Sequence, residues 1–364
     1  MVDSLMSGGA ELLATRIALG LDPDRFESVV CSTRPSAREH VAAVEAAGLE
    51  VLQLRRASKL DVWRWLPLVR LLRSGRIDVL HAHKFGSNLW ASLLTRLAPV
   101  PVLLAHEHSW SFEGAPLRRL VDRELVARAS TAIVAVSEPD RTRMVELERI
   151  PPEKVLLVPN GIPDQQPGNR TAARAALGIQ PEDPVVGTVC GLRPEKGVDV
   201  ALRAVARVAD ALPGLRFLAV GDGPERPRLE RLARELGVAA LFTGRRPNAD
   251  VPDLLAAMDV VVCSSRSEGM PLAVLEWMAA ARAIIAFAVG GIPTMIADGR
   301  EGVLVPPRDA ARLAAAIERL LADPAERERL GAAARARQRR EFPFRRTLDA
   351  IQEIYESAYG AALR

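Results

Sequence analysis

Two glutamates flank a proline in residues 267–279, SEGMPLAVLEWMA, just after an apolar run of the chain. Pro271 suits the first turn of a helix, where its missing N–H costs nothing, so Glu268 is expected before the helix and Glu276 inside it. Ligands of open α/β sheets bind outside the carboxyl ends of the strands, and helix N-termini attract phosphate. This spacing predicts a phosphate held by the backbone around residues 270–273, with a glutamate on either side to bond hydroxyl groups. The alternative interpretation is two solvated charges, one in a loop and one on a helix face.

Two cations follow a second apolar run, in residues 187–197, GTVCGLRPEKG. This segment is predicted to end a strand and open a helix, which places Arg193 and Lys196 at the carboxyl end of that strand. A guanidinium and an ammonium group three residues apart could clamp a pyrophosphate. Such a pair taken alone is usually solvated. Its position on the same predicted sheet edge as the two glutamates favours a functional interpretation of both segments.

Histidines gather near two expected strand ends. The five are His40, His81, His83, His106 and His108. A metal site made from the last four is one interpretation, but alternating histidine pairs at strand ends are more often structural. Asp22-Pro-Asp24 has the letters of an Asp-x-Asp metal motif, yet it falls in a polar turn between a helix and a strand. We therefore expect no metal.

The bulk composition limits the class of protein. A chain of 364 residues exceeds one comfortable hydrophobic core, which predicts two domains. The net charge of +4, from 49 Lys+Arg against 45 Asp+Glu, indicates a mixed surface and no nucleic-acid partner. Cys31, Cys190 and Cys263 lie far apart in strand-like runs and are expected to be buried and reduced. With no apolar run of about 18 residues and no signal-peptide pattern, a cytoplasmic protein is expected.

Short β-rich runs alternate with helical periods, which is the pattern of parallel α/β layers. The expected strands lie at residues 28–31, 50–54, 78–82, 100–104, 132–136, 155–158, 185–190, 216–220, 240–243, 260–263, 283–286 and 302–305. Two such sets predict two Rossmann-like domains, joined near residues 160–184. The glycine turn at residues 8–11 comes after too few residues for a full strand, so either the first strand is short or the chain begins several residues late. A final helix is expected at residues 347–363.

These motifs resemble, in order, those of the retaining glycosyltransferases of family 4, which have the GT-B fold. The matching segments are GGAE at 8–11, VPNGI at 158–162, GLRPEKG at 191–197, VGDGP at 220–224, FTGR at 242–245, SEGMP at 267–271 with Glu276, and GGIP at 290–293. They cover nearly the whole chain. The resemblance implies an α/β protein of two Rossmann-like α/β/α domains that face each other across a cleft. These would be an acceptor-side domain at 1–160, onto which a helix at 345–364 could pack back, and a nucleotide-sugar-binding domain at 161–344.

The resemblance also implies a role for each matching residue in binding the donor. Arg193 and Lys196 would neutralise the donor's pyrophosphate. Glu276 would bond the ribose hydroxyls, and Glu268 would bond the hydroxyls of the donor sugar. The backbone would contact phosphate or sugar at Gly8, Gly9, Gly269, Met270, Pro271, Leu272 and Ala273.

Further matching positions concern the nucleotide base and the reacting face of the sugar. The base would lie near residues 242–246, which include Arg245. The family has a histidine that faces the donor sugar, and its spacing fits His108 better than His106. Because two cations already supply positive charge, no metal or other cofactor is expected. The resemblance assigns no carboxylate nucleophile, which favours attack from the same face, with the leaving phosphate helping to deprotonate the acceptor.

The implied function is retaining transfer of a hexose-type sugar from a UDP- or GDP-sugar to a glycan, lipid-linked or small-molecule acceptor, in envelope polysaccharide or glycoconjugate biosynthesis. Residues 60–73, LDVWRWLPLVRLLR, could rest peripherally on the inner face of the plasma membrane, although such helices more often pack on their own sheet. The alternatives are a GT-B-fold sugar-nucleotide epimerase and an inactive sugar-nucleotide binding module. We expect Glu276→Ala and Lys196→Ala each to abolish turnover and to leave the fold intact.

Overall fold

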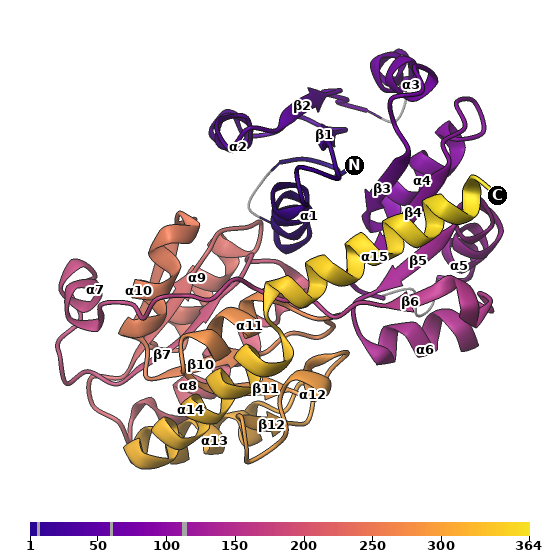
Figure 1. Cartoon of the computed structure of the whole chain (residues 1–364). Coiled ribbons are helices and arrows are strands. Elements are labelled where there is room, and N and C mark those ends of the chain that lie inside the picture. The colour runs from indigo at the N-terminus through magenta and orange to yellow at the C-terminus, as the bar shows by residue number, and fades with distance from the viewer. Residues whose placement is uncertain (6–7, 59–60, 111–114) are drawn as a thin grey trace. The chain divides into compact units, whose positions relative to one another are not determined.

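The chain forms two compact units of parallel strands and helices (Figure 1). The computed structural model describes residues 1–5, 8–58, 61–110 and 115–364. One unit consists of Met1–Pro159 and Arg345–Arg364, and the other of Asn160–Phe344. None of the helices in the described ranges has both the length and the apolar character needed to span a bilayer.

The first unit contains a four-stranded parallel sheet, β3-β4-β5-β6, and a parallel pair, β1-β2. Its strands are β1 (Val29–Ser32), β2 (Glu50–Gln53), β3 (Val79–His83), β4 (Val102–Glu107), β5 (Ala132–Ala135) and β6 (Val155–Leu157). The first residues of the chain bond to both sheets. Val2 forms a parallel bridge with Ser32, and the backbone N–H of His83 donates to the carbonyl of Met1 at 3.0 Å. In the described residues, a single bridge therefore stands where a full first strand would lie.

The helices of the first unit include one from the far end of the sequence. They are α1 (Gly9–Gly20), α2 (Arg38–Ala46), α3 (Leu66–Arg73), α4 (Lys84–Leu94), α5 (Pro116–Val121), α6 (Glu138–Glu146) and α15 (Phe344–Ala362), with helical turns η1 (Val62–Trp65), η2 (Asp122–Ala127) and η3 (Pro152–Lys154). The backbone N–H of Asp22 donates to the side-chain oxygen of Gln352 on α15 at 3.2 Å. Tyr355 on the same helix lies buried against His81 of β3. These contacts attach the terminal helix to the first unit.

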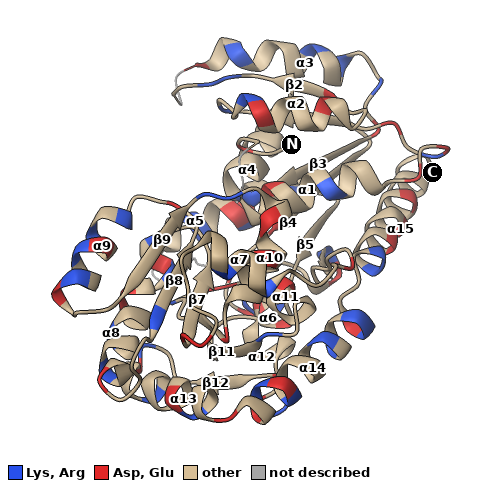
Figure 2. Ribbon diagram, turned by 90° about the vertical axis from the view of Figure 1, so that its left-hand side faces the viewer, with Lys and Arg blue, Asp and Glu red and all other residues tan. Residues whose placement is uncertain are grey.

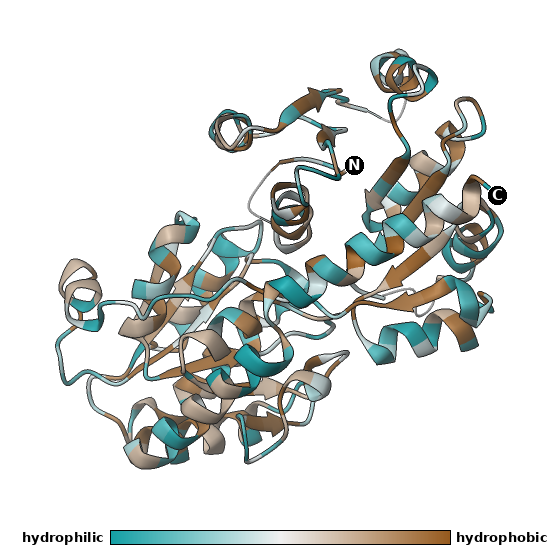
Figure 3. Ribbon diagram, in the orientation of Figure 1, coloured by the Kyte–Doolittle hydropathy of each residue, from teal (hydrophilic) through white to brown (hydrophobic). Residues whose placement is uncertain are grey.

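The second unit is a six-stranded parallel sheet in the order β12-β11-β10-β7-β8-β9. Its strands are β7 (Val185–Val189), β8 (Arg216–Val220), β9 (Ala240–Gly244), β10 (Val260–Cys263), β11 (Ala283–Phe287) and β12 (Val303–Val305). Strands of parallel sheets are covered on both faces and are therefore continuously apolar. Val260, Val261 and Val262 accordingly have no exposed surface, and the strands of this sheet are largely brown in Figure 3.

Helices cover this sheet and carry the charged surface of the second unit. They are α7 (Arg170–Ala176), α8 (Val198–Ala209), α9 (Arg226–Glu235), α10 (Val251–Ala257), α11 (Leu272–Ala279), α12 (Ile292–Met295), α13 (Ala310–Ala322) and α14 (Pro324–Glu341), with helical turns η4 (Pro194–Lys196) and η5 (Asn248–Asp250). The side chains of Asp309 and Asp323 cap α13 and α14 by accepting from backbone N–H groups at 2.9 Å. Basic and acidic residues alternate along α9, α13 and α14 (Figure 2), so these helices form no single-sign stripe.

Candidate functional site

An ion pair between Lys196 and Glu268 forms the centre of the candidate site in the second unit. The two residues follow β7 and β10, which are neighbours in the sheet, and Nζ of Lys196 lies 2.6 Å from Oε1 of Glu268. Their side chains are only 23% and 10% exposed. Burial lowers the pKa of the Lys196 ammonium, but the charge of Glu268 and the hydrogen bond to it outweigh burial and leave that pKa raised. Lys196 is therefore a permanently charged cation at the carboxyl ends of two central strands.

Backbone contacts hold the two loops that carry this pair. The hydroxyl of Ser264 donates to the carbonyl of Lys196 at 3.2 Å. Gly197 has φ +61°, and a Cβ there would lie 2.1 Å from the carbonyl oxygen of Ser264. Gly290 has φ +53°, and a Cβ there would lie 1.6 Å from the carbonyl oxygen of Glu268. Both positions therefore require glycine, for its positive φ and for the absence of a side chain.

Helix α11 begins at Leu272, four residues after Glu268, with Pro271 as its N-cap residue. Asn160 fixes the approach to this helix, because its side-chain amide donates to the carbonyl of Met270 at 2.7 Å. Leu272 and Ala273 are the first residues of the helix, and Glu276 is partly buried one turn later. The structure thus brings Glu268 and the start of α11, at Pro271 and Ala273, around one small cavity beside Lys196, and Glu276 lies further along the helix.

The remaining cations predicted for the donor site lie at the same edge of the sheet but are exposed. Arg193 is the N-cap residue of η4, its side chain is 55% exposed, and it pairs with Glu195 at 3.5 Å. Arg245 follows β9, the edge strand, and lies two strands away from β7, roughly 10 Å across the sheet. Lys196 is therefore the fixed cation of the site, whereas Arg193 and Arg245 extend from its rim.

A small cavity of about 20 Å³ adjoins the Lys196–Glu268 pair. It is lined in part by Thr188, Cys190 and Cys263, from β7, the residue after it and β10. Burial raises the pKa of the Cys190 thiol to about 11 and that of Cys263 to about 12. Both thiols are neutral at physiological pH, so neither is an activated nucleophile there.

The glycine turn of the first unit has an acidic neighbour that the sequence did not reveal. Gly8 is the N-cap residue of α1 and Gly9 is its first residue. The carboxylate of Glu11 lies against Gly8 and pairs with Lys84, a residue with φ +69° directly after β3. Glu11 and Lys84 are 73 residues apart in the chain. A ligand that contacts the backbone of this turn therefore also meets the Glu11–Lys84 pair.

Four histidines form one stacked block in the first unit. His81 and His83 lie on β3 and His106 on β4, while His108 follows β4; the register of the two strands puts His83 opposite His106. Nε2 of His81 is 3.2 Å from Nδ1 of His106, and Nδ1 of His83 is 3.0 Å from Nε2 of His108. The rings of His106 and His108 stack at 4.4 Å between centroids. The predicted active-site histidine is thus positioned by both His83 and His106.

Burial lowers the pKa of all four imidazoles and keeps them neutral. Ligand nitrogens of His81, His83 and His106 lie within 4.8 Å of one another, which is a metal-ligating combination. The rings of these histidines are stacked at interplanar angles of 29° between His81 and His83 and 28° between His83 and His106. Nδ1 of His81 contacts the hydroxyl of Tyr355 at 2.6 Å, whereas Nε2 of His106 is buried and has no hydrogen-bond partner among the described residues.

Three buried carboxyl groups, which no sequence motif indicates, lie on β4 and elsewhere in the first unit. Glu107 on β4 is 4% exposed and accepts from the side-chain amide of Asn88 at 2.7 Å. Asp122 and Glu148 are 1% and 2% exposed, and the indole N–H of Trp110 donates to Glu148 at 2.8 Å. Burial, followed by the charge of Asp122, raises the pKa of Glu148 to about 9. Nothing in the spacing of these residues predicts that they meet.

Comparisons with known proteins agree with this architecture. The family model for Glycosyltransferase Family 4 matches residues 7–166, and the model for Glycosyl transferases group 1 matches residues 169–337. A D-inositol 3-phosphate glycosyltransferase of Stackebrandtia nassauensis is 33% identical over 316 residues, covering 80% of this chain and 69% of that protein. The enzyme of the same name from Frankia alni is 30% identical over 354 residues, covering 89% and 87%.

Solved structures share the fold over almost the whole chain. Anabaena HepE in complex with UDP and glucose superimposes with a TM-score of 0.86 at 23% identity, covering 98% of both chains. WaaG, a glycosyltransferase involved in lipopolysaccharide biosynthesis, gives a TM-score of 0.77 at 20% identity, covering 98% of this chain and 99% of its own. Two α/β units with parallel sheets are the GT-B fold. The chain belongs to the family 4 glycosyltransferases of this fold.

Proposed function

We propose that the chain transfers a hexose from a nucleoside-diphosphate sugar to an acceptor hydroxyl with retention of configuration. The observation that carries this proposal is the buried Lys196–Glu268 pair beside the N-terminus of α11. It sets a cation and helix N–H groups, which stabilise phosphate, next to a carboxylate, which accepts bonds from sugar hydroxyls. A diphosphate sugar carries both kinds of group.

Each donor-site residue has one role in this proposal. Lys196 and the start of α11 bind the diphosphate, Arg193 closes over it from the rim, and Glu276 bonds the ribose. Positive charge fixed where the leaving diphosphate gains negative charge lowers the barrier by roughly 3–4 kcal/mol per group. With that charge supplied by side chains and N–H groups, the transfer needs no metal. Glu268 bonds the sugar hydroxyls and keeps Lys196 in place before the donor arrives.

The roles of these residues also determine which group takes the acceptor's proton. Glu268 is engaged by Lys196 and by the sugar, so it does not attack the anomeric carbon. The acceptor attacks from the face that the diphosphate leaves, and a phosphate oxygen takes the acceptor's proton. His108, oriented by His83 at 3.0 Å, bonds a hydroxyl of the donor sugar.

The names of similar proteins select the first substrates to test. The relatives are called D-inositol 3-phosphate glycosyltransferases, and HepE was solved with UDP and glucose. UDP-glucose, GDP-sugars and D-inositol 3-phosphate therefore come first, followed by glycan and lipid-linked acceptors. A lipid-linked acceptor would be reached from the cytoplasmic membrane surface by way of Val62, Trp63 and Leu66, whose exposed fractions are 59%, 60% and 51%.

Nucleotide release with and without acceptor tests the proposal. Release of UDP or GDP that requires an acceptor, with a product of the donor's anomeric configuration by NMR, is the expected result. Interconversion of two sugar nucleotides without acceptor would instead identify an epimerase. Binding of UDP without any turnover across the acceptor panel would identify an inactive binding module. Inverted product would overturn the same-face mechanism.

A further inference from the structure

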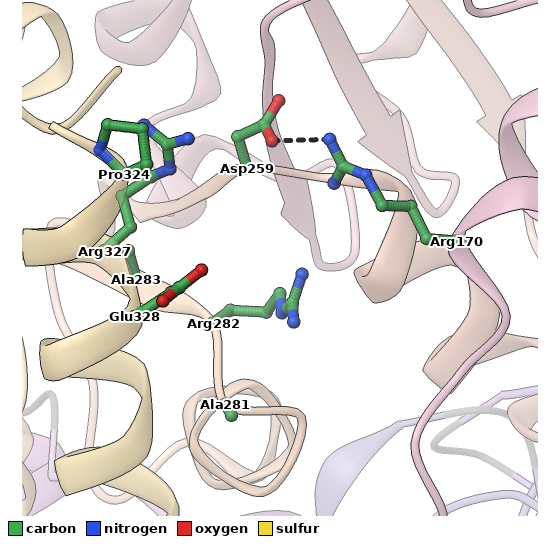
Figure 4. Close-up of a pocket in the computed structure, with 8 residues that line it drawn as sticks. All are labelled: Arg170, Asp259, Ala281, Arg282, Ala283, Pro324, Arg327 and Glu328. Atoms are coloured by element: carbon green, nitrogen blue, oxygen red, sulfur yellow. Dashed lines mark hydrogen bonds and ion pairs between the residues drawn. The ribbon is translucent and has the colours of Figure 1, made fainter. Parts of the chain in front are cut away.

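A second charged cavity lies at the other end of the sheet in the second unit. Its volume is about 250 Å³, and Figure 4 shows the side chains that line it. It is bounded by Asp259, which precedes β10, by residues 281–283 at the start of β11, and by the first turn of α14. Strand β10 has four residues and so separates this cavity from the Glu268 end of the sheet by roughly 13 Å. The cavity is therefore distinct from the donor site.

Three guanidinium groups surround this cavity, and backbone carbonyls hold each of them in place. Arg282 donates through Nε to Ala280 at 3.0 Å and through Nη1 to Met258 at 3.2 Å. Arg327 donates through Nη1 to the carbonyls of residues 320 and 321 at 2.6 and 2.8 Å. Arg170 donates to the carbonyl of residue 256 at 3.2 Å. Each guanidinium is thus oriented by neutral acceptors and keeps further N–H donors.

The acids of the cavity do not balance these cations. Asp259 accepts from Arg170 at 2.7 Å and from Arg174 at 2.9 Å, so one carboxylate serves two arginines. Glu328 is exposed and, within the described residues, forms no ion pair with Arg282 or Arg327. Three arginines therefore line the cavity with two carboxylates, one of which is shared with Arg174. Burial and the charge of Arg170 lower the pKa of Arg282, and the charge of Asp259 offsets only part of this effect.

We infer that this arginine cavity, lined by Arg170, Arg282 and Arg327, binds a small phosphate-bearing anion. Guanidinium forks match the geometry of phosphate oxygens, and their orientation by carbonyls reduces the entropy lost when an anion binds. The volume lies just below the range of about 300–1,000 Å³ typical of drug-sized ligands, which suits inorganic phosphate or a sugar phosphate. The anion would join the start of α7, the turn before β11 and the start of α14.

Isothermal titration calorimetry measures phosphate binding to the cavity. The proposed donor site is disabled by substitution, so that phosphate bound there does not contribute to the heat. The titrations use the full chain carrying Lys196→Ala and Glu268→Gln, because Lys196 would itself attract phosphate. Inorganic phosphate, pyrophosphate and a hexose phosphate are compared at constant ionic strength. Saturable binding of one of these is expected, and the tightest of the three distinguishes free phosphate from a phosphorylated metabolite.

Charge-changing variants assign the binding to the cavity. Arg282→Gln should weaken binding on the order of tenfold, because it removes a charge-assisted hydrogen bond. Glu328→Gln breaks no ion pair in the described structure and should tighten binding roughly two- to fivefold. Glu318→Gln, an exposed glutamate on α13 away from the cavity, is the matched control and should change nothing.

Two results would overturn the inference. One is the absence of saturable binding for all three probes. The other is binding that neither Arg282→Gln nor Glu328→Gln changes. Because Glu328→Gln is a gain-of-affinity variant, destabilisation by the loss of Arg282 cannot hide the answer. The measurement does not depend on glycosyl transfer, so it stands even if the proposed function fails.

Discussion

Removing the ammonium of Lys196 should lower both the stability of the second unit and the rate of transfer. Breaking a fully buried ion pair costs about 3–5 kcal/mol, and breaking an exposed one costs about 0–1 kcal/mol. Since the Lys196 and Glu268 side chains are 23% and 10% exposed, we expect Lys196→Ala to reduce the free energy of unfolding by about 2–3 kcal/mol. The sequence alone predicted that this variant would leave the fold unaffected. The ion pair changes that expectation.

The cost arises from the carboxylate that is left behind, so a second substitution should recover it. In Lys196→Ala/Glu268→Gln the buried position carries no charge, and most of the lost stability should return. Urea denaturation followed by circular dichroism measures all three proteins. Arg312→Ala is the matched control, because it breaks an exposed pair with Asp309 at 3.6 Å on the same unit and should cost less than about 1 kcal/mol.

Turnover should separate from stability in the same variants. Loss of a cation that stabilises the leaving diphosphate should reduce kcat on the order of 10²–10³-fold in both the single and the double variant. A stable but inactive double variant therefore places Lys196 in the chemistry and not only in the fold. The reasoning fails if Lys196→Ala is as stable as the parent protein, or if the double variant regains activity along with its stability.

Three further outcomes follow from other contacts. Glu276→Ala should raise KM for the donor at least about tenfold and leave the unfolding midpoint unchanged, because alanine suits a helix. His83→Ala should lower kcat more than it changes donor KM, and His83→Asn should restore part of the rate, because His83 orients His108. Glu148→Gln should make the first unit more stable at pH 8, by about 2 kcal/mol, and flatten its pH profile in urea titrations. The folded state holds Glu148 in its neutral form, with a pKa raised to about 9. The resulting stability is fully present below pH 4.5, and it is lost as the pH rises toward 9 because the unfolded state releases this proton first.

The sequence predicted all twelve strands that the structure contains in the described ranges, because buried parallel strands are apolar runs. Their ends were less predictable. The strand expected at residues 100–104 is β4, which continues through Glu107. His106 and Glu107 are polar, so the apolar run of the sequence ends before them. Both residues are nevertheless buried and bonded to side chains from β3 and α4. Tertiary partners of this kind extend a strand beyond its apolar run.

The sequence predicted at which edge of the sheet the site residues lie, but it did not predict which side chains contact one another. Parallel topology alone places Lys196 and Glu268 at the same carboxyl edge, and the structure confirms that placement. Their pairing, across 72 residues of sequence, depends on loop conformations that no periodicity encodes. The Glu11–Lys84 pair was missed for the same reason. Long-range ion pairs leave no local pattern in a sequence.

The charged pair depends on two residues that have no side chains. The loop after β10 approaches the loop after β7 at Gly197, and it approaches the loop after β11 at Gly290. A methyl group at either position would have to displace a backbone carbonyl, of Ser264 or of Glu268, because it would lie 2.1 or 1.6 Å from that oxygen. Such a displacement moves Glu268 away from Lys196, whereas a charge-neutral substitution of either side chain leaves the loops in place. The Lys196–Glu268 pair is therefore fixed first by how closely the three loops can approach, and only then by the charges they carry.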